Sequence, residues 1–287
     1  NGKRATGVVA AGRMIGARAE VILAAGALVS PKVLLLSGIG DGADLQALGM
    51  ETAHHLPGVG RNLQDHAAIH TVVKTKSRIP YGLSISSAPK LLWSAMDYAL
   101  SRRGLFGSNM VEGGGFVKTV PGLARPDIQY VFTPGYRARP PKLLAYGHGY
   151  SLTSVLLRPK SRGRVTLAGT AAAAAPLIDP RFFADADDLE VLLRGIKEAR
   201  RITGAGPFQA FEPTEIFPGD AVRTDDELRD YILGNSATIF HPVGTCRMGS
   251  DGAAVVDTRL RVHGMEALRV VDGAVMPTIT GGNTNAP

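Results

Sequence analysis

The chain has 287 residues, of which 45% are hydrophobic and 20% are charged, and its formal net charge is +7. This composition is typical of a globular protein and excludes a disordered chain, because enough apolar surface is available to offset the entropy of ordering. The 35 glycines follow no period of three, which excludes a collagen-like repeat, and the length fits one large domain or two ordinary ones.

The positive charge comes from 32 Lys and Arg residues against 25 Asp and Glu residues. The densest basic stretch, Arg158 to Arg164, contains no aromatic residue and matches no nucleic-acid-binding motif. We therefore expect a solvated basic surface and no nucleic-acid partner. A basic nucleic-acid-binding module is the alternative, and a salt-dependent shift with random DNA would reveal it.

The cysteine count, the spacing of the histidines and the hydropathy of the chain exclude further classes of protein. The single cysteine, Cys246, leaves no internal disulfide and suits a reducing compartment. The longest apolar stretch, residues 21–36, is interrupted by Ser30-Pro31-Lys32 and is too short for a membrane span of about 20 apolar residues. We predict no integral membrane segment and a cytoplasmic or membrane-peripheral location. The histidine pairs His54-His55 and His66/His70 lack a third ligand at the sequence spacing typical of a metal site, so no metal site is predicted.

The first third of the chain has an α/β pattern. Residues 18–26 predict a strand, because a β-branched run ends there in small residues and glycine. A helix is predicted from Ser30, as N-cap, to Ser37, with Pro31 at its first position. A short helix over residues 44–48 and a glycine-bearing polar loop over residues 56–66 follow.

The middle of the chain changes to an α+β pattern. Apolar and polar residues alternate in the manner of antiparallel strands over residues 70–76, 128–132 and 150–157. Helices are predicted over residues 88–103, 185–202 and 224–233. In the second of these, the apolar residues follow the i, i+3, i+4 spacing of a one-sided helix, namely Leu189, Leu192, Leu193, Ile196 and Ala199.

The end of the chain returns to an α/β pattern, with a strand over residues 268–272 that leads into Gly273. This order predicts a domain that is interrupted by an insertion, so that its first and last segments meet in space. The predicted fold class is therefore α/β plus α+β, with flanking helices and a mostly antiparallel sheet in the inserted domain.

Three clusters are candidates for chemistry, and each has a structural alternative. Residues 26–40 form a strand-to-helix turn that either faces a ligand or needs small residues only for packing. His241 follows an apolar segment and precedes a proline, so it is either a general base or a structural histidine. A strand that ends in Asp272-Gly273, with the glycine- and asparagine-rich loop after it, allows close backbone approach to a ligand but also forms a good surface turn. Cys246 has little support as a nucleophile.

Together these clusters closely resemble the glucose–methanol–choline (GMC) family of flavin-dependent oxidoreductases. The family pattern GAxxSPxxLxxSGIG is met from Gly26 to Gly40 without a mismatch. The further phrases LPGVGRNLQDH, LRPKSRGRVTL, HPVGTCRMG and VVDGAVMPTITGGNTNAP occur in the family's usual order. The wording is most similar to the choline-dehydrogenase-like and alcohol-dehydrogenase-like branch.

The resemblance implies oxidation of an alcohol to an aldehyde or ketone, with FAD as cofactor. His241 matches the family's catalytic base, which takes the hydroxyl proton while hydride leaves to flavin N5, and Asn285 matches the second catalytic position, which holds the substrate oxygen. The implied partners are a small alcohol and an electron acceptor, which is a quinone, another carrier or O2. The implied cofactor-binding residues are Ala25, Gly26, Phe240, Asp272, Gly273, Asn283 and Asn285.

The resemblance also implies a domain organisation. Residues 1–66 match part of a Rossmann-like FAD-binding domain, residues 67–236 match the substrate-binding domain, and residues 237–287 carry the catalytic histidine and return to the FAD-binding domain. The family's G-x-G-x-x-G fingerprint is not in this sequence. We therefore expect a partial sequence that does not hold FAD alone. A non-redox or lyase relative on the same scaffold, or an inactive fragment, is the alternative.

Overall fold

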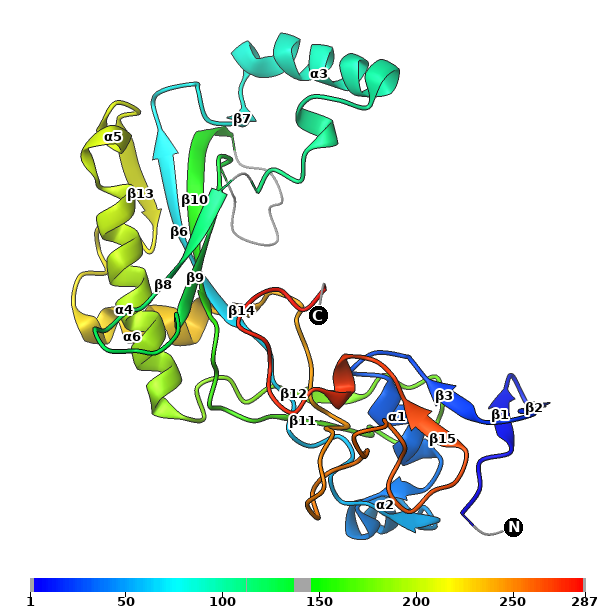
Figure 1. The fold of residues 1–287 in the computed structure, drawn as a ribbon. Helices are drawn as coiled ribbons and strands as arrows, with labels where there is room; N and C mark the ends of the chain where they lie inside the picture. The colour runs from blue at the N-terminus through cyan, green and yellow to red at the C-terminus, as the bar shows by residue number, and fades with distance from the viewer. Residues whose placement is uncertain (1–2, 112, 137–145, 286–287) are drawn as a thin grey trace. The chain divides into compact units, whose positions relative to one another are not determined.

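The structure is a computed structural model that describes residues 3–111, 113–136 and 146–285. It divides into two compact units. Unit 1 contains residues 1–66, 158–185 and 239–287, and unit 2 contains residues 67–157 and 186–238. In Figure 1 the red C-terminal segment lies beside the blue elements from the start of the chain, within unit 1.

Unit 1 is built from short strands and two short helices. The helices are α1 (Ser30–Leu36) and α2 (Gly42–Ala47). The strands are β1 (Gly7–Ala10), β2 (Arg13–Gly16), β3 (Val21–Leu23), β4 (Ile39–Gly40), β5 (His54–His55), β11 (Arg164–Thr166), β12 (Leu177–Asp179) and β15 (Leu268–Val270). They pair in twos: β1 with β2 and β11 with β12 are antiparallel, whereas β3 with β15 and β4 with β5 are parallel.

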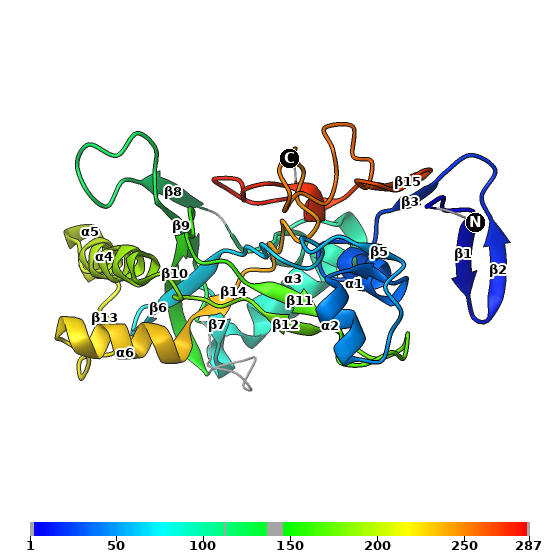
Figure 2. The same ribbon diagram turned by 90° about the horizontal axis from the view of Figure 1, so that it is seen from below.

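The parallel pair of β3 and β15 joins the two ends of the sequence (Figure 2). Val21 lies opposite Leu268, and Leu23 lies opposite Val270. The buried side chains around them come from α1, α2 and the segment before β15, and they include Leu34, Leu45, Val255, Val256 and Val262. The predicted meeting of the first and last segments is confirmed.

One segment differs from the predicted domain organisation. We placed residues 158–185 inside one continuous substrate domain over 67–236, but the structure groups them with unit 1. The backbone of the predicted loop 56–66 supplies their partners: Val165 N donates to Gly60 O at 2.7 Å, and Gly163 and Leu63 exchange two hydrogen bonds. These long-range pairings have no local sequence signal.

The close crossing at Gly60 gives a stability prediction. Gly60 has φ +77°, and a Cβ added there would lie 2.2 Å from the carbonyl oxygen of Val165. Replacing Gly60 with alanine is expected to lower the free energy of unfolding by about 2–4 kcal/mol, because the backbone is strained and β11 is displaced. Gly49→Ala is the matched control: Gly49 has φ +72° with open space around it, so alanine is expected to cost about 1 kcal/mol. Denaturant unfolding measures both, and equal losses would contradict the role of the crossing.

Unit 2 is a seven-stranded antiparallel sheet with helices against it. The main path is β13–β6–β10–β9–β8, with β14 beside β6 and β7 beside β10. The strands are β6 (Ala67–Thr75), β7 (Gly82–Leu83), β8 (Gly113–Val117), β9 (Ile128–Thr133), β10 (Gly147–Leu156), β13 (Pro213–Phe217) and β14 (Ala237–Thr238). The helices are α3 (Ala88–Ser101), α4 (Ala186–Thr203), α5 (Gly206–Gln209) and α6 (Asp225–Asn235).

Helix α4 packs against β6, β9 and β10, as Figure 1 shows. Its apolar stripe buries Leu192, Leu193 and Ile196, as the periodicity predicts. The hydroxyl of Tyr130 in β9 donates to the carbonyl of Gly195 at 2.8 Å, which joins sheet and helix. Together with the α/β elements of unit 1, this mainly antiparallel sheet confirms the predicted fold class.

Helices α6 and α3 match the sequence-based ranges with different degrees of packing. Thr224 caps α6 and forms the predicted capping box with Glu227. Helix α3 buries none of its residues and projects from the sheet (Figure 1). Its exposed apolar side chains are Leu92, Trp93, Met96 and Leu100.

Candidate functional site

The first part of the site is the pair of strand ends where β3 and β15 finish side by side. Asp272 follows β15, and its carboxylate accepts hydrogen bonds from two segments of unit 1. Oδ2 accepts from Gly26 N at 2.9 Å and from Ser30 Oγ at 2.5 Å, and Oδ1 accepts from Ala274 N at 2.7 Å. Asp272 therefore fixes the turn after β3 against the turn after β15.

Ser30 differs from its predicted role. We expected it to be the N-cap of α1, but Val29 occupies that position and Ser30 is the first helical residue. The Ser30 hydroxyl instead donates to Asp272 and accepts from Ala25 N at 3.1 Å. The bond to the carboxylate replaces the local cap because an ionised acceptor makes the stronger hydrogen bond.

The chain's own donors therefore occupy the side chain of Asp272. The backbone at the same strand ends is more open. Ala25 is exposed, and Gly26 has φ +84° with no atom within 4 Å of a Cβ built on it. A glycine with open space at the carboxyl end of a parallel strand allows a cofactor to approach the backbone closely. These residues and Gly273 fit the predicted flavin contact, which remains a prediction.

The second part of the site is the loop that carries His241. Phe240 has φ +67° and is 83% exposed, so an aromatic face on which a planar ligand packs well stands next to the histidine. The backbone N–H of His241 donates to Asp65 Oδ1 at 3.0 Å. Partial burial lowers the pKa of the His241 imidazole below its ordinary value, and the Asp65 carboxylate acts in the opposite direction. The backbone of His241 is thus held in place, and the lowered pKa of its ring favours the neutral imidazole.

The segment from Asn62 to His66, which we call the 62–66 segment, fixes this loop. Gln64 and Val243 exchange backbone hydrogen bonds of 3.0 and 2.9 Å. The amide nitrogen of Asn62 donates to Gly244 O at 3.1 Å. The ring of His66 contacts that of His241, with the two Nδ1 atoms 3.0 Å apart and the rings at 85°.

The same 62–66 segment also fixes the loop that leads to the two predicted asparagines. Gln64 Nε2 donates to Pro277 O at 3.1 Å, and Ile279 N donates to Gln64 Oε1 at 3.2 Å. His66 Nε2 lies 3.1 Å from Thr280 O. Asn283 and Asn285 follow on this loop and are exposed. The structure thus connects His241 and the asparagine loop through one short segment of unit 1.

Sequence reasoning missed the 62–66 segment as part of the site. It served only as part of a family phrase, and its histidine was weighed only as a metal ligand. One signal was available: Gln64, Asp65 and His66 are three consecutive polar residues directly before an apolar strand, and all three are buried. Buried polar side chains of this kind require specific partners.

A cysteine nucleophile, a metal site and a membrane-spanning helix can also be checked against the structure. Cys246 is fully buried, and burial together with the nearby Asp272 carboxylate raises the pKa of its thiol well above the ordinary range, so it is not a nucleophile. Over residues 3–111, 113–136 and 146–285, no three His, Cys, Asp or Glu side chains are grouped to hold a metal ion. In the same ranges, every helix is too short or too polar to cross a membrane.

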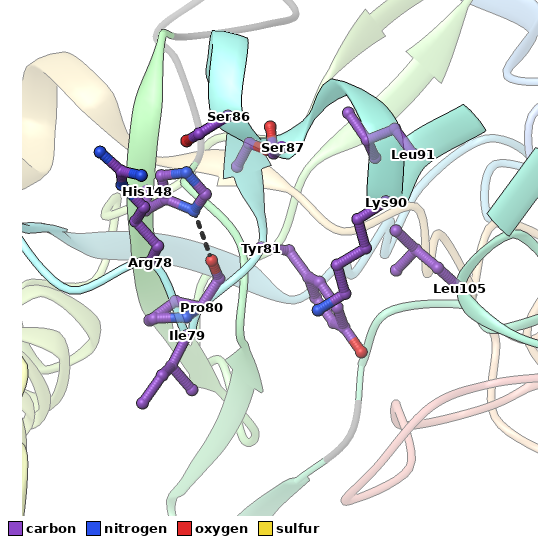
Figure 3. A pocket seen from close by; sticks show the side chains of 11 residues that line it. Arg78, Ile79, Pro80, Tyr81, Ser86, Ser87, Lys90, Leu91, Leu105 and His148 are labelled. Atoms are coloured by element: carbon purple, nitrogen blue, oxygen red, sulfur yellow. Dashed lines mark hydrogen bonds between the residues drawn. The ribbon is translucent and has the colours of Figure 1, made fainter. Parts of the chain in front are cut away.

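Unit 2 contains a separate pocket with a volume of about 220 Å³ (Figure 3). His148 lies on one side of it and donates from Nδ1 to the carbonyl of Pro80 at 2.8 Å. On the other side, Lys90 Nζ lies 5.9 Å from the centre of the Tyr81 ring. The pocket includes none of the predicted site residues.

Comparisons with known proteins agree with the sequence phrases. Two family models, both described as GMC oxidoreductase, match residues 1–68 and 159–287. The alcohol dehydrogenase (acceptor) of Pseudomonas putida is 44% identical over 268 residues, which are 93% of this chain and 49% of that protein. An oxygen-dependent choline dehydrogenase of Brucella ovis is 38% identical over 294 residues, which are 100% of this chain and 53% of that protein.

A solved structure shows the same fold. A variant of the Aspergillus oryzae RIB40 formate oxidase, solved in work on FAD modification, superposes with a TM-score of 0.83 at 27% identity. The match covers 94% of this chain and 52% of that one. The chain spans about half the length of the curated relatives it matches.

Proposed function

The chain belongs to the GMC oxidoreductase family, and from this premise we propose that it is part of a FAD-dependent enzyme that oxidises an alcohol to an aldehyde or ketone. FAD is the cofactor that the family and the formate oxidase support. The alcohol and choline dehydrogenases among the relatives support a CH–OH donor. The reaction would also need an electron acceptor, such as a quinone, another carrier or O2.

The observation that carries this proposal is the position of His241. Its backbone is fixed by Asp65 and its ring by His66, while the partly exposed imidazole has a pKa below the ordinary value. A neutral, rigidly held imidazole is a general base at pH 7. Ala25, Gly26, Gly273, Phe240, Asn283 and Asn285 are the residues that would surround the flavin in this proposal.

In the proposed reaction, the residues of this chain accept one proton and position the substrate oxygen. His241 takes the hydroxyl proton of the alcohol, so that negative charge develops on the oxygen while the C=O bond forms. When bound, FAD would supply the two-electron acceptor for the hydrogen on the alcohol carbon. Asn285 donates a hydrogen bond to the substrate oxygen and keeps it in line with His241. The products would be the carbonyl compound and a protonated His241, with the two electrons accepted by the bound cofactor.

Anaerobic reduction of the flavin tests the proposal. The FAD-loaded enzyme of which this chain is a part is mixed with primary alcohols, secondary alcohols and choline, and the flavin absorbance is followed. At least one alcohol is expected to bleach the flavin, with one carbonyl product formed per flavin. Product formation without bleaching would instead indicate a lyase, and no bleaching by any alcohol would contradict the proposed reaction.

The pH dependence of bleaching tests the base. The rate is expected to be constant at neutral pH and to fall about tenfold per pH unit below the pKa of His241, because only the neutral imidazole accepts the proton. Burial lowers that pKa, so the constant range should extend below the ordinary histidine value of about 6.5. A rate that rises as the pH falls through this range would contradict a histidine base.

A further inference from the structure

Beyond the base itself, we propose that His66 is a positioning residue that fixes the tautomer of His241, with the proton on Nδ1 and the lone pair on Nε2. This inference rests on the proposed function of His241 as a base. It follows from the hydrogen-bond partners of two adjacent rings, both within unit 1.

The carbonyl of Thr280 determines which nitrogen of His66 carries a proton. His66 Nε2 lies 3.1 Å from this oxygen, and a carbonyl oxygen only accepts hydrogen bonds. His66 must therefore carry a proton on Nε2. The ring is fully buried, and burial disfavours a second proton because that proton would bring a positive charge out of water. The neutral form has a bare lone pair on Nδ1.

The protonation of His66 in turn determines which nitrogen of His241 carries a proton. The two Nδ1 atoms are 3.0 Å apart, so one of them donates to the other. Since Nδ1 of His66 is bare, Nδ1 of His241 carries the proton. A neutral imidazole has only one N–H, so Nε2 of His241 is bare and is the atom that accepts a proton.

This arrangement also serves the protonated state. After His241 takes a proton on Nε2, its Nδ1–H still donates to the lone pair of His66. That hydrogen bond becomes charge-assisted and therefore stronger, so it stabilises the imidazolium as the reaction proceeds. The Asp65 carboxylate accepts a hydrogen bond from the backbone N–H of His241, and its negative charge favours the protonated imidazole. Among the described residues, the titratable groups His66 and Asp65 act on His241.

The Thr280 carbonyl links the tautomer to the second loop of the site. Thr280 belongs to the loop that continues to Asn283 and Asn285, and Gln64 holds the same loop through Pro277 and Ile279. Displacement of this loop would remove the acceptor that keeps the proton on Nε2 of His66. The base is therefore set in its reactive form only when the asparagine loop is in place.

Long-range ¹H–¹⁵N spectra of the enzyme labelled with ¹⁵N-histidine test the proposal without turnover. They distinguish a protonated ring nitrogen from a bare one, and the His241 signals are assigned by their loss in His241→Gln. Above the pKa of His241, Nδ1 is expected to be protonated and Nε2 bare. A His241 protonated on Nε2 in the unmodified enzyme would overturn the proposal.

Variants of His66 separate positioning from folding. His66→Phe keeps an aromatic ring but removes the acceptor, so both His241 tautomers are expected, with kcat in the FAD-loaded enzyme lowered about 10- to 100-fold and KM changed less than about threefold. His66→Asn keeps an acceptor close to the Nδ1 position and is expected to restore the Nδ1–H tautomer and most of kcat. If His66→Phe fails to fold, the His241 tautomer measured in the unmodified enzyme and in His66→Asn tests the proposal.

The control is another histidine of unit 1 whose Nε2 donates to a carbonyl. His54 donates in this way to His263 O at 2.9 Å and does not contact His241. His54→Asn is expected to leave the His241 tautomer and kcat unchanged. A His66→Phe enzyme with an unchanged tautomer would overturn the inference. A correct tautomer together with full activity of an enzyme without His241 would instead refute only the proposed base.

Discussion

Replacing His241 with alanine is expected to lower kcat for alcohol oxidation by at least about 100-fold. A positioned general base contributes on the order of 10² to 10⁴ in rate, because hydride leaves far more readily from a carbon whose oxygen is becoming an alkoxide. The alanine variant removes the proposed proton acceptor together with its contact to His66, and it leaves the residues proposed to surround the flavin unchanged. Rapid-reaction measurement of flavin bleaching isolates this step from the later oxidation of the flavin.

The expected loss should also change the pH profile. Without His241 the hydroxyl proton must go to water or hydroxide, so the rate is expected to rise with pH and to show no plateau near neutrality. His55→Ala is a suitable control, because His55 is exposed and accepts from Gly42 N on the α2 side of unit 1. A His241→Ala enzyme that bleaches within about threefold of the unmodified rate would remove His241 from the mechanism.

Local signals in the sequence predicted much of the fold. Helix α4 follows from its apolar spacing, and α6 follows from the capping box of Thr224 and Glu227. The same is true of β3, whose β-branched run ends in small residues, and of β15, which leads into Gly273. These elements were predictable because neighbours in the chain carry the signal.

Elements that depend on distant partners were not predictable in this way. The hairpin of β1 and β2 was missed, since its exposed strands lack a clear alternating pattern. The return of residues 158–185 to unit 1 depends on pairing with Gly60 and Leu63, about 100 residues earlier in the chain. Backbone pairing at such separation leaves no periodicity in either segment.

The candidate site likewise contains one residue with a local sequence signal and one segment that depends on distant partners. The resemblance pointed to His241 directly, because a short phrase surrounds it. The 62–66 segment carries no such indication, and its role appears only when its partners are known: His66 contacts two residues more than 170 positions away. Contacts of this range are a property of the folded chain.

The three hydrogen bonds accepted by the Asp272 carboxylate lead to a second prediction with a large effect. Asp272→Ala removes the acceptor for Gly26 N, Ser30 Oγ and Ala274 N at once. Each hydrogen bond to a charged group contributes about 1.5–3 kcal/mol, and the three are not additive because they share one carboxylate. The free energy of unfolding is therefore expected to fall by about 3–5 kcal/mol. Ser30→Ala removes one of these bonds and is expected to lose about 1–2 kcal/mol.

The same substitution should weaken FAD binding on the order of 100-fold, because the Asp272 carboxylate joins the open turn at Gly26 to the turn after β15. Small displacements of a binding group have large effects. Asp257→Ala is the matched control: Asp257 also accepts from three donors of unit 1, namely Arg259 N, Arg261 N and Arg261 Nε, but it lies on another turn. That variant is expected to lose stability and to keep its affinity for FAD. Fluorescence titration of the apoenzyme with FAD, next to denaturant unfolding, separates the two effects. If Asp272→Ala and Asp257→Ala bound FAD equally well, Asp272 would be a turn residue with no part in shaping the cofactor site.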